Sequence, residues 1–244
     1  MLTPLRYFLG AGLCAALLAG CGNDETSSSS ITSPNSALSS AAAAVASNAA
    51  PASQDFARRS GELLNPDDSA VVMLYYDLTG ISPPIDNWVE EDTRVRFAPA
   101  PDKAPKRNAV RAELEAAAGG VRDVGVIRLT MNANLSEYDP TYEEFTVRAL
   151  APSSVVTFNA LGQKVSLRFA NGNDAQVWRV PLAQSQAIRD RIGYSGASLD
   201  ALLKIVSVQP GPAGGTIITN VTEYELRENR SGVAIARVRV EHDE

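Results

Sequence analysis

The clearest pattern in the sequence is an alternation of apolar and polar residues from 127 to 135. Apolar residues such as Ile127 and Leu129 occupy every second position, and Arg128 and Thr130 stand between them. A period of two predicts a β-strand, and one apolar face opposite one polar face is typical of a sheet with one side in water. We therefore expect this strand to belong to an antiparallel sheet.

More segments of strand length follow, separated by residues that form turns. Four of them are residues 143–150, 155–159, 164–170 and 176–180. Asp-Pro, Ala-Pro, Leu-Gly and Asn-Gly-Asn separate these segments, and such sequences are typical of turns. Three last segments, residues 202–208, 215–226 and 232–241, are predicted to form a three-stranded meander.

One strand is also predicted before these segments. Residues 70–76 form a continuous apolar run that ends near Asp77 and Gly80. A short, uninterrupted apolar run indicates a strand that is buried on both faces. Pro83 and Pro84 then interrupt regular structure.

Helical spacing is found in three other segments. In residues 107–118, Val110 and Leu114 recur on one face and two glycines follow. Residues 181–192 begin with proline and are followed by glycine, as is typical of a helix. Residues 86–92 predict a shorter helix. The whole pattern predicts an α+β fold, with one predominantly antiparallel sheet and a few covering helices.

The amino-terminal region follows a different pattern. Residues 7–18 are apolar and follow a single charge, Arg6. This stretch is too short to span a bilayer, which needs roughly 20 apolar residues. Its layout is that of a signal peptide. It ends in Leu18-Ala19-Gly20-Cys21: a leucine, two small residues and a cysteine.

This ending resembles the lipobox of bacterial lipoproteins. The resemblance implies cleavage before Cys21 and acyl chains on that cysteine, which would anchor the protein to a membrane. Gly22 follows the cysteine, where many lipoproteins of the inner membrane carry aspartate. The resemblance therefore implies an outer-membrane protein that faces the periplasm. The alternative is an ordinary secretory peptide, cut after Ala19 or Gly20.

Composition divides the rest of the chain. Residues 22–53 are almost entirely Ser, Ala, Asn, Thr and Pro, and such a segment buries too little apolar surface to fold. We expect a signal peptide at residues 1–20, a lipidated cysteine with a disordered tether at 21–54, and a single α+β periplasmic domain at 55–244. About 190 residues suffice for a substantial core.

Charge and cysteine content narrow the functional classes. The chain has 22 basic and 28 acidic residues and no basic stripe long enough to track nucleic acid. Its two cysteines, Cys14 and Cys21, both lie in the amino-terminal region. The domain therefore has neither a disulfide nor a thiolate metal ligand.

The residues that catalysis commonly requires are scarce. The single histidine, His242, is three residues from the end. A weak metal site there is less probable than a solvated tail, so we expect no metal and no cofactor. Ser195 is not followed by the glycine that a nucleophile elbow requires, because Gly196 comes one residue too early.

Carboxylates are the remaining candidates for catalysis. Three groups stand out: Glu90, Glu91 and Asp92; Asp139 with Glu143 and Glu144; and Glu223 with Glu225. A glycosidase needs two carboxyl groups that face each other across a cleft. Each group is better explained as part of a solvated face.

One stretch combines aromatic and polar residues just after the alternating strand. Tyr138, Asp139 and Tyr142 surround a proline turn. They are candidates for a binding rim that contacts peptide or glycan. The alternative is that both tyrosines pack over the edge of the sheet while Asp139 starts the turn.

This stretch, with residues 75–78 and 177–180, resembles uncharacterised domain families of Gram-negative envelope proteins, over most of residues 70–240. The resemblance implies no particular activity. We therefore expect a membrane-anchored envelope lipoprotein that acts as a non-catalytic binding or assembly module with a protein partner. The alternative is a carboxylate-dependent hydrolase of the cell envelope.

Overall fold

Seven strands form the main sheet of the computed structural model, which describes residues 56–193 and 195–241. The chain divides into two units, Met1–Ser47 and Asn48–Glu244, and every described residue belongs to the second. The predicted signal peptide, Cys21, almost all of the predicted tether and His242 lie outside the described residues.

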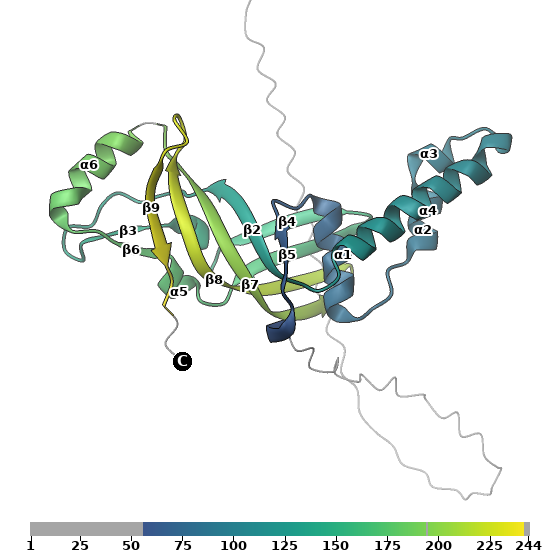
Figure 1. The fold of residues 1–244 in the computed structure, drawn as a ribbon, viewed down its shortest axis with the longest axis horizontal. Coiled ribbons are helices and arrows are strands. Elements are labelled where there is room, and N and C mark those ends of the chain that lie inside the picture. Colours follow the sequence, from purple (N-terminus) through teal and green to yellow (C-terminus); the bar gives the residue numbers. More distant parts are fainter. Residues whose placement is uncertain (1–55, 194, 242–244) are drawn as a thin grey trace, which may run out of the picture. The chain divides into compact units, whose positions relative to one another are not determined.

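The sheet has the order β1-β2-β7-β8-β5-β4, and β9 also pairs with β8 (Figure 1). Its strands are β1 (Gly61–Leu64), β2 (Val124–Asn132), β4 (Val155–Ala160), β5 (Gln163–Phe169), β7 (Ala197–Gly211), β8 (Gly214–Glu228) and β9 (Ala234–Arg239). The predicted alternating strand, the predicted strands at residues 155–159 and 164–170, and the predicted meander of β7, β8 and β9 are confirmed. The strands β4 and β5 pair with each other as a hairpin.

The sheet is mixed rather than purely antiparallel. Four strand pairs are antiparallel, but β1 pairs with β2 in parallel and β5 pairs with β8 in parallel. Parallel neighbours require a long crossover, and both pairs have one. Helices lie between β1 and β2. The segment between β5 and β8 contains a short helix (Gly172–Ala175), the strand β6 (Val177–Arg179), the helix α6 (Leu182–Ile192) and β7. The predicted α+β class is confirmed.

The long strand β8 has three partners. All of its length pairs with β7, while its other edge is shared: residues 214–219 pair with β5 and residues 223–227 with β9. Asn171 occupies the interval between these partners. Its side chain donates to the carbonyl of Val221 at 2.9 Å and accepts from the N–H of Val221 at 2.8 Å. The buried backbone of Val221 is therefore fully paired.

A second sheet contains only β3 (Glu144–Thr146) and β6 (Val177–Arg179). The sequence predicted one strand over residues 143–150, and this is wrong beyond residue 146. The chain turns into a 3-10 helix, Arg148–Leu150, after Val147 donates to the carbonyl of Gln176 at 2.7 Å. The apolar residues of this segment are buried in the core, but they do not extend the strand.

The predicted strand at residues 70–76 is wrong, because this segment is part of the helix α1 (Asp68–Thr79). Asp67 caps the helix by accepting from the N–H of Ala70 at 2.8 Å, and Gly80 ends it with a φ of 69°. The helix packs between the sheet and the helix α4 (Lys103–Gly120), so consecutive residues are buried around most of its circumference. A helix without a polar face has no helical period to detect, and its apolar run resembles that of a buried strand.

The predicted helices are present with shifted ends. They are α2 (Ile85–Glu91), α4 (Lys103–Gly120) and α6 (Leu182–Ile192). Two short helices that were not predicted are α3 (Thr93–Arg96), which follows α2, and α5 (Gly172–Ala175), which precedes β6. The helices α2, α3 and α4 form an arm beside the sheet (Figure 1). Their own small core consists of Val89, Val95 and Val110. No helix among the described residues is both long and apolar enough to cross a bilayer.

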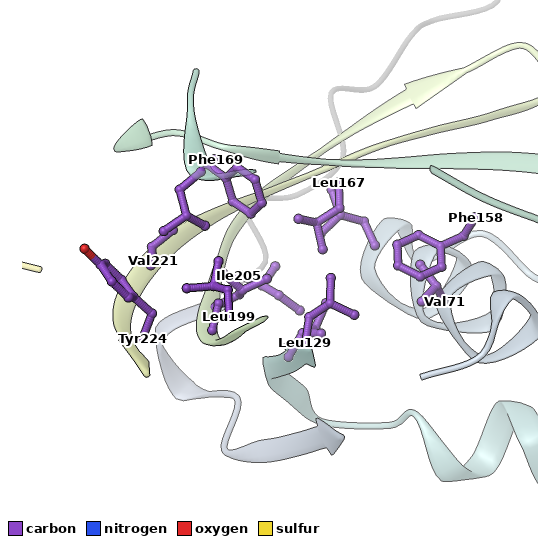
Figure 2. Packing of buried hydrophobic residues seen from close by; sticks show 14 of the residues in the cluster. Val71, Leu129, Phe158, Leu167, Phe169, Leu199, Ile205, Val221 and Tyr224 are labelled. Carbon is purple, nitrogen blue, oxygen red and sulfur yellow. The ribbon is translucent and has the colours of Figure 1, made fainter. Parts of the chain in front are cut away.

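The main core lies against one face of the sheet. Figure 2 shows side chains from several strands and α1 meeting there, among them Leu129, Leu199 and Val71. The opposite face carries Arg128, Asp200 and Glu225, whose neighbours in sequence point into the core. The alternation of β2 follows from this division: its apolar residues face the core and its polar residues face solvent.

Candidate functional site

The predicted rim residue Tyr138 packs against the small sheet. Its ring centroid lies 5.1 Å from that of Phe145, and its hydroxyl donates to the carbonyl of Val180 at 2.8 Å. Desolvation raises the pKa of Tyr138 above its ordinary value. The side chain therefore ties the loop before β3 to the end of β6.

Asp139 and Tyr142 occupy a turn. The carboxylate of Asp139 accepts from the N–H groups of Thr141 at 2.8 Å and Tyr142 at 3.3 Å, which holds the turn closed. The side chain of Tyr142 is 70% exposed. An open hollow of about 590 Å³ gathers Tyr138, Asp139 and Glu137, whereas Tyr142 is not part of its lining. Two residues of the predicted rim, Tyr138 and Asp139, therefore line one hollow, and the exposed Tyr142 lies outside that lining.

The acidic residues of the arm are engaged by arginines. Glu90 accepts from Arg107 at 2.5 and 2.8 Å, and Asp92 accepts from Arg94 at 2.9 and 3.1 Å. The hydrogen bond with arginine lowers the pKa of each carboxyl group. A general acid at neutral pH needs the opposite shift, so these two carboxyl groups are poorly suited to donate a proton.

Glu223 and Glu225 project from the solvent face of β8, as their spacing indicates. Glu223 accepts from Arg237 at 2.6 Å and forms an ion pair with Arg239 at 3.5 Å. Glu225 forms an ion pair with Arg227. The two carboxylates are 20% and 21% exposed, and each is paired with at least one arginine from its own or the neighbouring strand.

The third acidic group surrounds the turn before β3. Glu144 lies in β3, where its backbone pairs with Asp139, and Glu143 precedes it with a φ of 54° and an exposed side chain. Within the described ranges, no three His, Cys, Asp or Glu side chains are grouped so that they could hold a metal ion. The geometry of these acids does not supply two opposed carboxylates in a cleft.

A second concave feature is a groove between β6 and β9, with a volume of about 580 Å³. One side is formed by α5 and β6, and the other by β9 and the residues that follow it. The lining residues are Asn173, Asp174, Val177, Trp178, Arg179, Arg237, Val238, Arg239, Val240 and Glu241. We refer to these residues as the β6–β9 groove.

The edge of β9 on this groove has unpaired backbone groups. Val240 donates to the carbonyl of Thr222 at 3.0 Å, and the register places Val238 opposite Tyr224. Antiparallel pairing uses alternate residues, so Val238 and Val240 face β8 while the N–H and C=O groups of Arg237 and Arg239 point outward. Within the described residues, β9 pairs with β8 alone.

The edge of β6 has the same character. Gln176 accepts from Val147, and Val180 donates to the carbonyl of Glu143 at 2.8 Å. By the same alternation, the N–H and C=O groups of Val177 and Arg179 point away from β3. Two unpaired strand edges therefore flank one groove.

Arginine side chains add positive charge to the groove. Arg237 and Arg239 share the single carboxylate of Glu223, and their side chains are 64% and 89% exposed. Arg179 is exposed and makes no ion pair within the described part of the chain. Guanidinium groups have several N–H donors, so one shared carboxylate leaves donors available for a ligand.

This groove was not predicted from the sequence. The alternation of Arg237 and Arg239 with Val238 and Val240 indicates a strand with one charged face. Which edge of that strand stays unpaired depends on contacts distant in sequence, and these are set by the fold. No known protein family, curated protein or solved structure matches this chain significantly.

Proposed function

We propose that this protein is a non-catalytic binding module of the cell envelope, which takes an extended segment of a partner protein into the β6–β9 groove. The observation that carries the proposal is the pair of unpaired strand edges on that groove. An extended peptide added to a sheet edge gains main-chain hydrogen bonds, and its side chains supply specificity. Here one peptide could bond to both edges.

The charges on the groove favour a partner segment with acidic residues at alternate positions. Arg237 and Arg239 are two residues apart in β9, so their side chains lie on the same face. Acidic side chains on the same face of an added strand would lie next to them. The segment that binds would therefore be extended and acidic.

The location in this proposal rests on the sequence. The lipobox-like ending at Cys21 supports a lipid anchor, and Gly22 supports transfer to the outer membrane with the domain in the periplasm. A flexible segment of about 32 residues has a root-mean-square reach of roughly 30 Å. Such a tether would let the domain engage partners away from the membrane surface.

The carboxylate-dependent hydrolase receives less support. Five of the candidate acids are paired with arginines or hold a turn: Glu90, Asp92, Asp139, Glu223 and Glu225. The proposal of a binding module would be wrong if the purified protein turned over peptidoglycan, glycan or ester substrates and a single carboxylate substitution abolished that turnover.

Crosslinking in living cells tests the groove directly. A photo-crosslinking amino acid at position 179 or 239 should capture the same partner, because the two positions flank one groove. Position 157 is the matched control, since Thr157 is exposed on the edge strand β4. Equal capture of the same partner from position 157 would contradict a role for the groove.

Two substitutions at Arg239 separate the contribution of its backbone N–H to binding from that of its side chain. Arg239→Pro removes an outward N–H that β8 does not use, while Arg239→Ala removes only the side chain. Loss of one hydrogen bond of about 1 kcal/mol should weaken crosslinking of the proline variant roughly fivefold beyond the alanine variant. Equal binding by the two variants, with unchanged thermal stability, would show that the edge of β9 does not pair with the partner.

A further inference from the structure

The tip of the arm carries the most exposed large hydrophobic side chain of the described residues. Phe97 follows α3 directly and is 74% exposed. Alanine and proline occupy the next four positions, 98–101, before Asp102 leads into α4. The tip is therefore small and apolar around one aromatic ring, and it lies at the end of the arm remote from the sheet (Figure 1).

Positive charge is concentrated at the same place. Residues 94–107 contain five basic residues and a single acidic one, Asp102, in a chain whose net charge is −6. Two of the five basic residues are already paired: Arg94 with Asp92 and Glu113, and Arg107 with Glu90. We call the remaining cations, Arg96, Lys103 and Lys106, the tip cations.

The tip cations have no ion pair among the residues that the structure describes. The guanidinium carbon of Arg96 lies 5.6 Å from the centroid of the Phe97 ring. The aromatic ring and this cation therefore form one unit at the surface. Salt bridges with Glu90 and Asp86 hold α4 against α2 behind it, which keeps the tip in place.

The combination of these residues favours a lipid surface over a protein surface. The core of a protein interface is depleted in lysine, and the tip has two lysines beside its aromatic ring. At a membrane the ring can enter the headgroup region, while the long basic side chains extend to the lipid phosphates. The Phe97 ring is 74% exposed, so it is accessible to such a surface.

We propose that residues 96–106 dock onto an anionic lipid surface, with the Phe97 ring among the headgroups and the tip cations against lipid phosphates. This interaction is separate from the β6–β9 groove and does not require the lipid on Cys21. An anchor holds the protein near a membrane at high effective concentration, so even weak contacts at the tip would set the orientation of the domain.

Fluorescence on vesicles tests the proposal with the full chain. An environment-sensitive fluorescent amino acid replaces Phe97 in one protein and Tyr142, another exposed aromatic, in a second. Both proteins are reconstituted with vesicles of phosphatidylethanolamine and phosphatidylcholine, with or without phosphatidylglycerol. The probe at position 97 should shift to the blue and be quenched by brominated lipid only where phosphatidylglycerol is present, and the probe at position 142 should do neither.

Charge variants determine whether the tip cations are responsible. Each basic residue near an anionic surface strengthens association about fivefold. Replacing all three tip cations with glutamine should therefore weaken the response of the probe at position 97 to phosphatidylglycerol by roughly 100-fold. The matched control replaces Lys164, Arg168 and Arg191, which are exposed and belong to β5 and α6, and should keep the response.

Three outcomes would overturn the proposal. The first is a probe at position 97 that stays in water on every vesicle. The second is an equal response on neutral and anionic vesicles, or an equal loss in the control variant. The third is a response that appears only when another protein is added, which would place the tip in a protein interface. Flotation of the vesicles reports anchoring separately, so failure of the anchor and failure of the tip are distinguishable.

Discussion

Tyr224 combines deep burial with an unpaired polar atom. Its side chain is 1% exposed, and its hydroxyl has no hydrogen-bond partner among the described residues. In Figure 2 this oxygen points away from the other labelled side chains of the core. A buried hydroxyl without a partner carries a desolvation cost of about 1–3 kcal/mol, so the residue contributes its ring to the core at the expense of its polar end.

Replacement of Tyr224 by phenylalanine should therefore leave the free energy of unfolding unchanged or raise it by up to about 2 kcal/mol. Tyr138→Phe deletes the same atom but loses the hydrogen bond to Val180, and should lower the free energy of unfolding by about 1 kcal/mol. Urea denaturation at neutral pH measures both. A loss of stability in the Tyr224 variant as large as that in the Tyr138 variant would show that the Tyr224 hydroxyl is satisfied.

Tyr224 also makes the free energy of unfolding depend on pH in the alkaline range. Desolvation raises the pKa of Tyr224 above its ordinary value of 10.0. Above pH 10.0 the unfolded chain releases this proton while the folded protein keeps it, so stability falls as the pH rises. Urea denaturation above pH 10.0 should show a smaller alkaline loss for Tyr224→Phe than for the unmodified protein.

At the scale of elements, α1 depends on its amino-terminal cap. Asp67 accepts from the N–H of Ala70, and the hydroxyl of Ser69 donates to it at 2.7 Å. Asp67→Ala should lower the free energy of unfolding by about 1 kcal/mol, whereas Asp67→Asn keeps an acceptor and should lose much less. Thermal and urea denaturation of the two variants provide the measurement.

Acid titration adds a second readout for this cap. The hydrogen bonds from Ser69 and from the N–H of Ala70 lower the pKa of Asp67 from its ordinary value of 3.8. Its stabilising effect is therefore present above pH 3.8 and is lost as the pH falls through the lowered pKa of the folded state. The Asn variant should lack this part of the acid sensitivity; an identical acid profile would mean that the carboxylate is not the cap.

The sequence predicts a strand or helix correctly where one face lies in the core and the other in solvent, and it fails where this contrast is absent. The period of two in β2 and the segments of the meander could be recognised, because each has one face in the core and one in solvent. For α1 this contrast is absent, and only the cap at Asp67 and the left-handed Gly80 distinguish it from a strand. The parallel pairing of β5 with β8 joins residues about 50 positions apart, which no local pattern specifies.

The candidate sites show the same limit. The turn formed by Asp139 could be predicted, since Asp before Pro is a local feature. The β6–β9 groove could not, because the unpaired edges of β6 and β9 arise from which strands lie next to them. Likewise, the exposure of Phe97 depends on how the arm packs, although its basic neighbours are evident in the sequence.

For the whole molecule, the anchor at Cys21 is the strongest expectation from sequence, and it lies outside the described residues. Cys21→Ser removes the thiol that would take the diacylglyceryl group. This variant should therefore incorporate no labelled fatty acid and accumulate as unprocessed precursor. Metabolic labelling and fractionation provide the measurement, with Cys14→Ser as the control that should behave like the unmodified protein. Normal processing and fractionation of the Cys21 variant would exclude lipidation at this position.

The three partners of β8 also determine the order in which the chain can fold. The strands β1 and β2 join the rest of the sheet only through β7, and β4 and β5 join it only through β8. Both connecting strands lie in the last third of the sequence, at residues 197–228. A growing chain that has not yet produced them holds separate, incomplete pairs, and long-range pairing of this kind is slow. Cooperative folding must therefore wait for nearly the complete polypeptide. Until then the growing chain stays largely unfolded and can still be threaded.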